Sequence, residues 1–444
     1  MASAHSTAFP PTEPLSLQTG RLPWRKTFIA LGVPNFRIWT VGNLLAMTGG
    51  WTQRIAQDWL VLELTGSATA VGITVAMQFA PMLFFGLLGG VLVDRHSKRM
   101  LLIITQALFA VLSIGLAVLT LLGVVEAWHV FAIAFATGLV TVVDNPARQV
   151  IVTELVGHRN LRNAISINSS VFQLAGMIGP AIAGVLLLTV GAGPAFLLNG
   201  IACLFVIVML GMLRTAQMSR VAPSPRAKGQ LREGLRYAVA KPTILYPVIL
   251  IAVFAVFGLT MPVLLASYAD DVFAVGPGGY GLFNSMVALG ALTGALLSTR
   301  RSSIRLRTIV ISVGLTGLLQ AVAGLMPTIA LFSACLVAVG VACLLFLTAS
   351  NSLVQMSSNI GIRGRVMSLY VLVLLGGQAI GGPLMGVIIE KFGAHAGMVV
   401  SGGVPALAAV IVALVLARRR QLRLQVRLRR FVPSVSIATR PPLG

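Results

Sequence analysis

The feature that most constrains this chain is a run of about twenty apolar residues that recurs from residue 36 to residue 417. A helix rises about 1.5 Å per residue, so each run is long enough to cross a hydrocarbon core roughly 30 Å thick. Hydrophobic residues make up 57% of the 444 residues and charged residues only 10%, which excludes a soluble globular protein. The sequence therefore predicts an all-α polytopic membrane protein.

The turns between these runs alternate along the chain between turns rich in Lys and Arg and turns with few or none. Of the 33 Lys and Arg residues, only Arg54 and Lys391 do not lie on the side of the membrane that carries the basic turns. Because basic turns stay in the cytoplasm, both termini are expected there, and the number of spans must be even. The net charge of +22 follows from the same clusters and does not indicate nucleic-acid binding. We predict twelve spans in a bacterial inner membrane, approximately Phe36–Leu62, Ala70–Val93, Met100–Gly123, Trp128–Asn145, Ala164–Val190, Pro194–Leu213, Thr243–Tyr268, Gly279–Thr299, Arg307–Met326, Thr328–Ser350, Arg365–Ile389 and Ala396–Ala417.

A long basic segment near the middle of the chain separates six spans from six. Within it, Leu231–Pro242 has the amphipathic pattern of a helix that lies at a membrane surface. The first thirty residues contain no apolar signal region, so we expect the first span itself to direct insertion. The predicted organisation is a cytoplasmic N-terminal segment (1–34), an N-terminal six-helix half (35–213), a cytoplasmic linker (214–242), a C-terminal six-helix half (243–417) and a basic cytoplasmic tail (418–444).

The two halves resemble each other in sequence. A shift of about 203 residues places Arg162 on Arg365 and Gly179-Pro180 on Gly382-Pro383, each within or beside a hydrophobic span. Duplicated six-helix halves are characteristic of transporters in which one half moves against the other. The repeat therefore favours a transporter.

Four charges gather in the turn after the second span. At this place in a duplicated twelve-span chain, the turn resembles the loop signature of the major facilitator superfamily. That signature usually has a second glycine where this chain has Ser97. The resemblance extends from Asn35 to Ala417 and implies the two-half transporter fold of the superfamily. The residues that carry it read Gly90-x-x-x-Asp94-Arg95-x-Ser97-Lys98-Arg99.

Three further motifs narrow the resemblance. Gly176–Gly184 (GMIGPAIAG), in the fifth span, is similar to the glycine–proline motif of antiporters in this superfamily. Asp144–Gln149 (DNPARQ) and Leu62–Ser67 (LELTGS) are similar to a bacterial exporter branch that contains macrolide efflux proteins and the enterobactin exporter. The resemblance implies proton-driven export without identifying the substrate. It also implies that close packing along these glycines, and along Gly382 and Pro383, forms the moving seam between the halves.

The same resemblance implies a role for the acid in the charged turn. It places the start of the eleventh span, near Arg363–Arg365, beside Asp94. A helix start offers unpaired N–H groups and the positive end of a dipole, so Asp94 would tie the two halves together on the cytoplasmic side. The bases of the turn are explained better as determinants of topology, whereas the positive-inside rule does not require Asp94. We predict a conformational latch formed by Gly90, Asp94, Arg95, Lys98 and Arg99.

Asp144 and Arg148 lie four residues apart on one helix face. They fit a local ion pair at the membrane surface, which contributes little to stability. They fit equally well a role in the conformational latch, in which Arg148 joins the contacts around Asp94. The sequence leaves both interpretations open.

The first span carries the most informative polar residues. Asn43, Met47, Gly50, Arg54 and Asp58 recur at intervals of three or four, so one helix face is polar and small. Arg54 lies about 17 residues beyond the cytoplasmic end of the span, or roughly 25 Å along the helix. Ionisable groups at such a depth are costly and usually face a bundle interior or a watery cavity.

Asp58 lies one turn beyond Arg54 and is expected to pair with it. The pair is either structural, with a snorkelling arginine, or a proton-coupling site in which Arg54 governs the proton affinity of Asp58. Because no other acid lies as clearly inside a span, we assign proton coupling to Asp58 and Arg54. Neutral polar residues in the spans are candidates for cavity contacts, and each is also a candidate interhelical hydrogen-bond partner. The predicted substrate cavity is lined by Asn43, Met47, Gln78, Asn284 and Asn351.

The sequence contains no P-loop, no metal-ligand cluster and no arrangement of a nucleophile with a base, so no enzyme, metal or cofactor is predicted. The leading interpretation is a monomeric secondary transporter that exports an amphipathic small molecule, drug-like or siderophore-like, in exchange for protons. The alternatives are an importer or a lysolipid flippase on the same fold, or a membrane scaffold or receptor that transports nothing.

Overall fold

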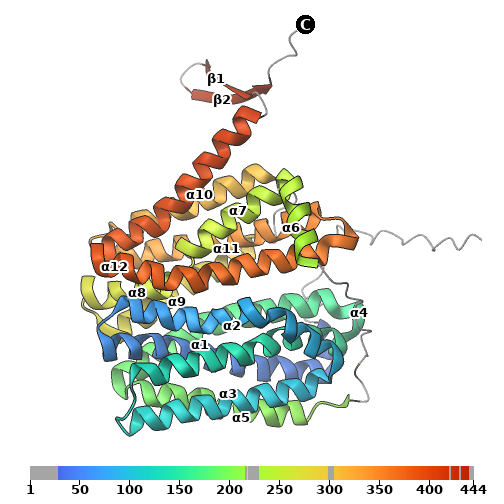
Figure 1. Cartoon of the computed structure of the whole chain (residues 1–444), viewed down its shortest axis with the longest axis vertical. Helices are drawn as coiled ribbons and strands as arrows, with labels where there is room; N and C mark the ends of the chain where they lie inside the picture. Colours follow the sequence, from blue (N-terminus) through green and yellow to red (C-terminus); the bar gives the residue numbers. More distant parts are fainter. Residues whose placement is uncertain are drawn as a thin grey trace, which may run out of the picture.

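The computed structural model describes residues 29–215, 218, 230–298, 305–419, 422–429 and 432–439. Its helices lie roughly side by side in two stacked groups, one from each half of the chain (Figure 1). The elements are the short helix Ile29–Gly32, α1 (Pro34–Thr65), α2 (Ala68–Arg95), α3 (Lys98–Leu121), α4 (Ala127–Thr189), α5 (Ala192–Gly211), α6 (Gln230–Ala240), α7 (Pro242–Phe257), α8 (Met261–Ser267), a π-helical turn (Tyr268–Val272), α9 (Gly276–Ser298), α10 (Leu306–Ala323), α11 (Ile329–Ser357), α12 (Ile360–Arg419), β1 (Leu422–Arg429) and β2 (Val432–Thr439).

The predicted α-helical membrane bundle is confirmed. Within the described residues, ten helical stretches have the length and hydropathy to cross a membrane. The 32-residue α1, which carries Arg54 and Asp58, is not one of them. Residues 362–418 count as one stretch although their backbone turns at Gly393. The number twelve stays a prediction.

Two glycines separate spans that run on as single helices. Gly157 has φ 64° and ψ −179° within α4, between the predicted fourth and fifth spans. Gly393 has φ 84° and ψ 163° within α12, between the predicted eleventh and twelfth spans. A residue with a Cβ rarely adopts a positive φ, so glycine allows the chain to reverse with no loop of its own.

The predicted seventh span is interrupted where the sequence expects one helix. α7 ends at Phe257 and α8 begins at Met261. Pro262 has no N–H to donate to the carbonyl of Gly258, four residues earlier. That carbonyl accepts instead from Gln320 Nε2 of α10, at 3.3 Å. The break is therefore a consequence of one proline and is stabilised by a neighbouring helix.

The buried apolar residues form three clusters whose placement differs between the two ends of the bundle. We call the end with the α1–α2 turn and Gly393 the outer end, and the end with α6 and the α2–α3 turn the inner end, following the predicted topology. At the outer end one cluster contains residues of both halves, from Ile55 to Met398. At the inner end the halves have separate clusters, one within residues 30–213 and the other within 238–412. Among the described residues, the halves therefore share a core only at the outer end.

Close backbone contacts between the halves run through the predicted glycines. A Cβ added to Gly281 of α9 would lie 2.6 Å from the Cα of Gly184 in α4. A Cβ added to Gly382 of α12 would lie 2.5 Å from the carbonyl oxygen of Gly72 in α2. No side chain fits at such distances, so glycine is required for α4 to meet α9 and for α2 to meet α12.

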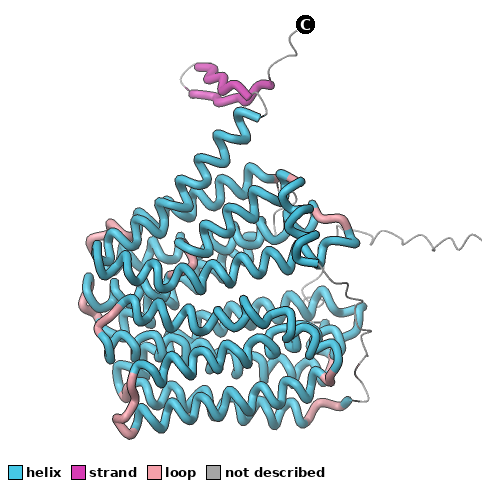
Figure 2. Tube along the Cα trace, viewed as in Figure 1, coloured by secondary structure: helices cyan, strands magenta, loops and turns pink. Residues whose placement is uncertain are grey.

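The linker and the tail are described only in part. Residues 1–28, 216–217, 219–229 and 440–444 lie outside the described residues, and so does most of the predicted N-terminal segment. α6 contacts the C-terminal half, because the Tyr237 hydroxyl accepts from Lys241 Nζ at 2.5 Å and from the Asn359 N–H at 3.2 Å. Beyond α12, β1 and β2 form an antiparallel hairpin away from the bundle (Figure 2), an exception to the predicted all-α fold.

Candidate functional site

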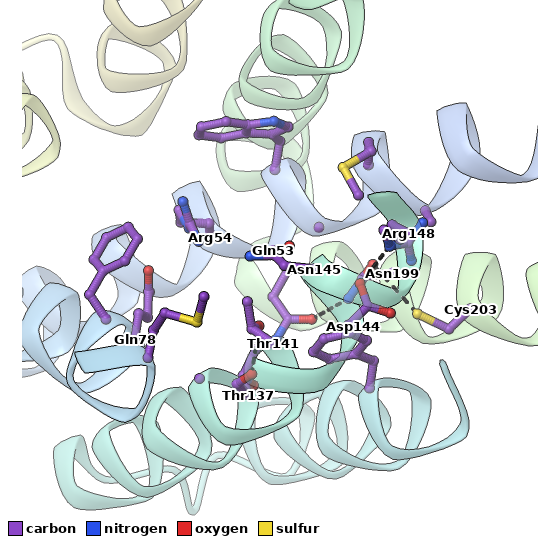
Figure 3. Close-up of a pocket in the computed structure, with 18 of the residues that line it drawn as sticks. Gln53, Arg54, Gln78, Thr137, Thr141, Asp144, Asn145, Arg148, Asn199 and Cys203 are labelled. Carbon is purple, nitrogen blue, oxygen red and sulfur yellow. Dashed lines mark hydrogen bonds and ion pairs between the residues drawn. The ribbon is translucent and has the colours of Figure 1, made fainter. Parts of the chain in front are cut away.

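A cavity of about 400 Å³ lies on the inner side of the shared outer core. Its lining comes from α1, α2, α3, α4 and α5, with Leu375 and Gln378 of α12 as the two contributions of the C-terminal half. In Figure 3, Arg54 and Gln78 lie toward one side, the Asp144–Arg148 pair lies toward the other, and Thr141 and Asn145 lie between them. The cavity is therefore a feature of the N-terminal half that one helix of the other half covers.

Arg54 lines this cavity, as the polar face of the first span predicts. Its guanidinium carbon lies 5.2 Å from the ring centroid of Trp51 and 5.3 Å from that of Phe79. A cation held over aromatic faces is attracted by their electron density, which offsets part of the cost of removing it from water. Arg54 is thus positioned by two rings on the wall of the cavity.

Asp58 lies one turn beyond Arg54, behind the cavity lining and with no exposed surface. Its Oδ2 accepts from the hydroxyl of Tyr280 in α9 at 3.2 Å, and its Oδ1 has no hydrogen-bond partner. In the described structure no ion pair joins Asp58 to Arg54, so the expected direct pairing is not what the structure shows. Asp58 instead contacts the other half of the molecule.

Asp144 and Arg148 form a buried network rather than a surface pair. Arg148 Nε lies 2.5 Å from Asp144 Oδ2, and Arg148 also donates to Asn43 Oδ1 at 2.7 Å. Asp144 Oδ1 accepts from Thr105 Oγ1 at 2.7 Å and from Gln106 Nε2 at 3.2 Å. The predicted local ion pair is present, and α1 and α3 cover both of its groups, so it is not exposed. The network ties α1, α3 and α4 together at the inner side of the cavity.

The five predicted cavity residues separate into two groups. Met47 and Gln78 line the cavity. Asn43 does not line it, because its side chain bonds Arg148 and also donates to Asn168 Oδ1 at 2.8 Å. The two asparagines of the C-terminal half do not line it either: Asn284 donates to the carbonyl of Tyr280, and Asn351 accepts from Gln355. None of these three asparagines lines the cavity in this arrangement of the helices, and their role in binding cargo stays a prediction.

Several lining residues were not predicted from the sequence. Gln53 and Gln57 continue the polar face of α1 and were detectable by the same three-to-four spacing. Gln53 Oε1 accepts from Ser113 at 2.5 Å and from Asn199 at 2.6 Å, which joins α1, α3 and α5. The other unpredicted polar residues sit singly in apolar helices, where no pattern marks them; they are Gln106, Thr137, Thr141, Asn145 and Asn199.

The charged turn after α2 makes several contacts within the N-terminal half. Lys98 Nζ lies 3.7 Å from Glu154 of α4. Arg99 donates to the carbonyls of Leu210 and Gly211 at 2.7 and 2.6 Å, and so satisfies the C-terminal end of α5. The remaining latch residues occupy the last turns of α2, where Gly90 and Asp94 are half-buried and Arg95 is exposed.

The predicted glycine–proline motif lies against α1 and α9. The hydroxyl of Thr52 donates to the carbonyl of Gly179 at 3.1 Å, and Gly176 lies beside the Trp51 ring. Pro180 and Pro383 both lie inside helices, where they remove one backbone donor each. Across the described residues, no group of three or more His, Cys, Asp or Glu side chains could hold a metal ion.

Comparison with known proteins matches residues 26–437 to the family described as transmembrane secretion effectors. The multidrug efflux pump Tap of Mycolicibacterium fortuitum is 27% identical over 395 residues, 86% of this chain and 95% of that protein. The enterobactin exporter EntS of Escherichia coli is 24% identical over 399 residues, 88% of this chain and 94% of that protein. A staphyloferrin A transporter of Staphylococcus aureus is 31% identical over 169 residues, but these are only 38% of this chain and 42% of that protein.

Two solved structures show the same fold. A bacterial homologue of the lysosomal transporter Spinster, in an inward-facing conformation, has a TM-score of 0.66 at 17% identity and covers 90% of this chain and 98% of that chain. A bacterial homologue of ferroportin, in an inward-facing state, has a TM-score of 0.64 at 18% identity and covers 86% and 98%. At such identities the likeness concerns the fold alone.

Proposed function

Because the chain belongs to the transmembrane secretion effector family of the major facilitator superfamily, it is a multi-pass membrane transporter and not an enzyme, and we propose that it exports an amphipathic small molecule in exchange for protons. Its relatives Tap and EntS are named as an efflux pump and an exporter, which supports export over import or lipid flipping. A transported cargo also distinguishes it from a scaffold or receptor on the same fold.

The observation that carries this proposal is the unequal packing of the two ends. The shared outer core, the Gly184–Gly281 contact and the Gly72–Gly382 contact close the outer end. The cavity lies on the other side of this closure, within the N-terminal half and covered by α12, where the two halves have separate cores. This is the arrangement expected of an inward-facing carrier loading cargo from the cytoplasm. Export then requires the outer contacts to part and the inner ends to meet.

Asp58 is the group to which we assign the proton. Opening the outer end would part Tyr280 from Asp58 and bring the carboxyl group to outside water. Returning to the inward-facing state buries Asp58 completely, and burial of an ionised carboxylate is costly. Taking up a proton from outside removes that cost. Arg54 lies between Asp58 and the cavity, on the route by which the proton would reach the cytoplasm.

Everted membrane vesicles test the export and its coupling together. Respiration acidifies their interior, which corresponds to the outside of the cell, and acridine orange reports the acidity. Addition of enterobactin or erythromycin should release protons from vesicles that contain the protein and should load the compound inside. Vesicles without the protein and vesicles with Asp58→Asn are the controls. Uptake without proton release would refute the proposed coupling to protons. An absence of uptake across a wider panel of amphipathic compounds would refute export.

The placement in a bacterial inner membrane, with both termini in the cytoplasm, is also part of the proposal. Single cysteines at Ser67, Asp271 and Gly393 should react with an impermeant maleimide added to intact cells. Cysteines at Ser97, Ser224 and Ser302 should not react, although the last two positions lie outside the described residues. Labelling of position 224 from outside would overturn the division into two halves. Light scattering of the purified protein should give the mass of a monomer.

A further inference from the structure

Three residues of the cavity lining each have a buried polar atom that the protein itself leaves unused. These atoms are Gln78 Oε1 of α2, Gln106 Oε1 of α3 and Thr137 Oγ1 of α4, all buried and without a hydrogen-bond partner. Gln78 is 8% exposed and Gln106 is 1% exposed. A buried polar atom without a partner raises the free energy of the folded protein, and a ligand that draws such a side chain toward the cavity and bonds to it relieves that cost. The three atoms therefore indicate what a bound molecule must supply.

The orientation of Gln106 follows from its neighbour. Asp144 is an ionised carboxylate held by Arg148, and such a group only accepts hydrogen bonds. The Gln106 amide must therefore turn its Nε2 toward Asp144, at 3.2 Å, and leave Oε1 as the unpartnered atom. Gln106 thus presents an acceptor, and a matching group on the cargo must be a donor.

The charges of the lining do not favour a cationic cargo. Asp144 is the acidic residue of the described lining, and Arg148, Thr105 and Gln106 already occupy its oxygens. The positive charge of Arg54 lies against Trp51 and Phe79, with Asp58 one turn behind it. When Asp58 is ionised, as the cargo-bound state of a proton exchanger requires, the two acids balance the two arginines. The cavity then offers no net charge of either sign to a ligand.

Apolar side chains complete the site. Phe109, Phe172, Met82 and Leu375 line the same cavity. Burial of apolar surface against them gains about 25 cal/mol per Å², so a planar or ring-containing cargo is favoured over a small sugar. The site combines apolar walls with three side chains that can accept a hydrogen bond, of which the Thr137 hydroxyl can also donate one.

We propose that Gln78, Gln106 and Thr137 form an acceptor wall, and that the cargo is an uncharged amphipathic molecule whose O–H or N–H groups donate to this wall. The inference rests on the proposed export function and adds the chemical class of the exported molecule. The wall belongs entirely to α2, α3 and α4. Selection of the cargo is therefore made by the N-terminal half, before the halves move.

Matched probes on one ring system test this class. Equilibrium dialysis against the full-length protein in lipid nanodiscs would give dissociation constants for 2,7-dihydroxynaphthalene and for its dimethyl ether, which keeps the shape but has no donor. The dihydroxy probe should bind about tenfold tighter or more, the value expected for one or two good hydrogen bonds. Probes on the same ring that carry a trimethylammonium or a carboxylate group should bind more weakly than the dihydroxy probe.

Substitutions assign the preference to the wall. Thr137→Val keeps the shape and removes a hydroxyl that bonds nothing in the protein, so it should lower the preference for the dihydroxy probe about two- to tenfold. Thr120→Val, whose hydroxyl bonds its own helix outside the cavity, is the matched control and should change nothing. Gln78→Leu is the second test variant. An unchanged affinity for the dimethyl ether shows that each variant retains the cavity.

Three outcomes would overturn the inference: equal binding of the two neutral probes, tighter binding of the cationic or anionic probe, or an undiminished preference in both wall variants. None of these bears on export, which the vesicle experiment measures separately. Conversely, donor-selective binding without any transport would support the acceptor wall and refute the proposed export function.

Discussion

The hydroxyl of Tyr280 donates to Oδ2 of Asp58 at 3.2 Å, although 222 positions separate the two residues in the chain. The bond joins α9 of the C-terminal half to α1 of the N-terminal half. Tyr280 and Asp58 are both fully buried, and the ring of Trp59 packs against Tyr280 with centroids 5.9 Å apart. The proposed export cycle breaks this contact when the outer end opens, and so links the state of one carboxyl group to the conformation of the whole molecule.

Tyr280→Phe should weaken the outer closure without removing the ring that packs there. The lost hydrogen bond is worth about 1 kcal/mol to a neutral carboxyl group and up to about 3 kcal/mol to an ionised one. The outward-open population should therefore rise about fivefold or more. A cysteine at Ala70, buried in the shared outer core, should react faster with an impermeant maleimide from outside. Tyr268→Phe, whose hydroxyl bonds Gly324 within the C-terminal half, is the control, and equal rates in both variants would contradict the prediction.

Asp58→Asn should abolish export driven by a pH gradient and leave downhill exchange of cargo partly intact. The amide fits the same space but cannot gain and lose a proton. Export and exchange are measured in the same proteoliposomes, with and without an imposed gradient. Full pH-driven export by the variant would mean that the carboxyl group is structural and that coupling lies elsewhere or is absent.

Glu390→Gln tests a second contact across the outer end. Glu390 of α12 accepts from the hydroxyl of Ser67 and, at 3.1 Å, from the N–H of Thr69 at the start of α2. A neutral amide is a weaker acceptor, and the site is exposed, so outside labelling of the Ala70 cysteine should rise only about two- to fivefold. Glu126→Gln is the matched control, because the contacts of Glu126 stay within the start of its own helix. If the control variant raises labelling equally, the contact between the halves is not the cause.

Arg148→Met should be among the most destabilising single changes in the N-terminal half. It leaves the buried Asp144 without its cation, a situation that costs about 3–5 kcal/mol. The Tm of the detergent-purified protein should fall clearly, and adding Asp144→Asn should recover much of the loss. Lys98→Met, which breaks the longer 3.7 Å contact with Glu154, should have a smaller effect. A double variant no more stable than Arg148→Met would show that the arginine matters for its packing rather than its charge.

Asp94→Asn should weaken the proposed latch on the inner side and increase the inward-open population. The contact of a carboxylate with a helix start is worth roughly 1.5–3 kcal/mol, so a balanced equilibrium would shift about tenfold or more. A cysteine at Met47, in the cavity lining, should react faster from the cytoplasmic side in everted vesicles. Transport should fall much more than protein abundance. Unchanged reactivity would mean that Asp94 only stabilises its own turn and does not connect the two halves.

Patterns within single helices predicted part of the cavity lining. The spacing along the first span indicates Met47 and Arg54, and the structure places both on the cavity wall, because the polar face of one helix is a local property. The same spacing suggested that Asp58 pairs with Arg54. The structure places Tyr280 against that carboxyl group instead, from a helix that no local pattern connects to α1. Asn284 and Asn351 were chosen for polarity alone, and polarity does not reveal which face of a helix meets the cavity.

By itself the sequence determined the properties that depend on neighbours within one helix or turn. These are the helical membrane bundle, the charged turn after the second span, and the duplicated halves that indicate a transporter. Only the tertiary structure decided that Asp144 and Arg148 are buried, that Gln106 turns its amide nitrogen toward Asp144, and that the halves share a core at one end. The reason is that each of these depends on contacts between helices that lie far apart in the chain. Two halves built from the same helices can close at either end, and the packing between them selects which.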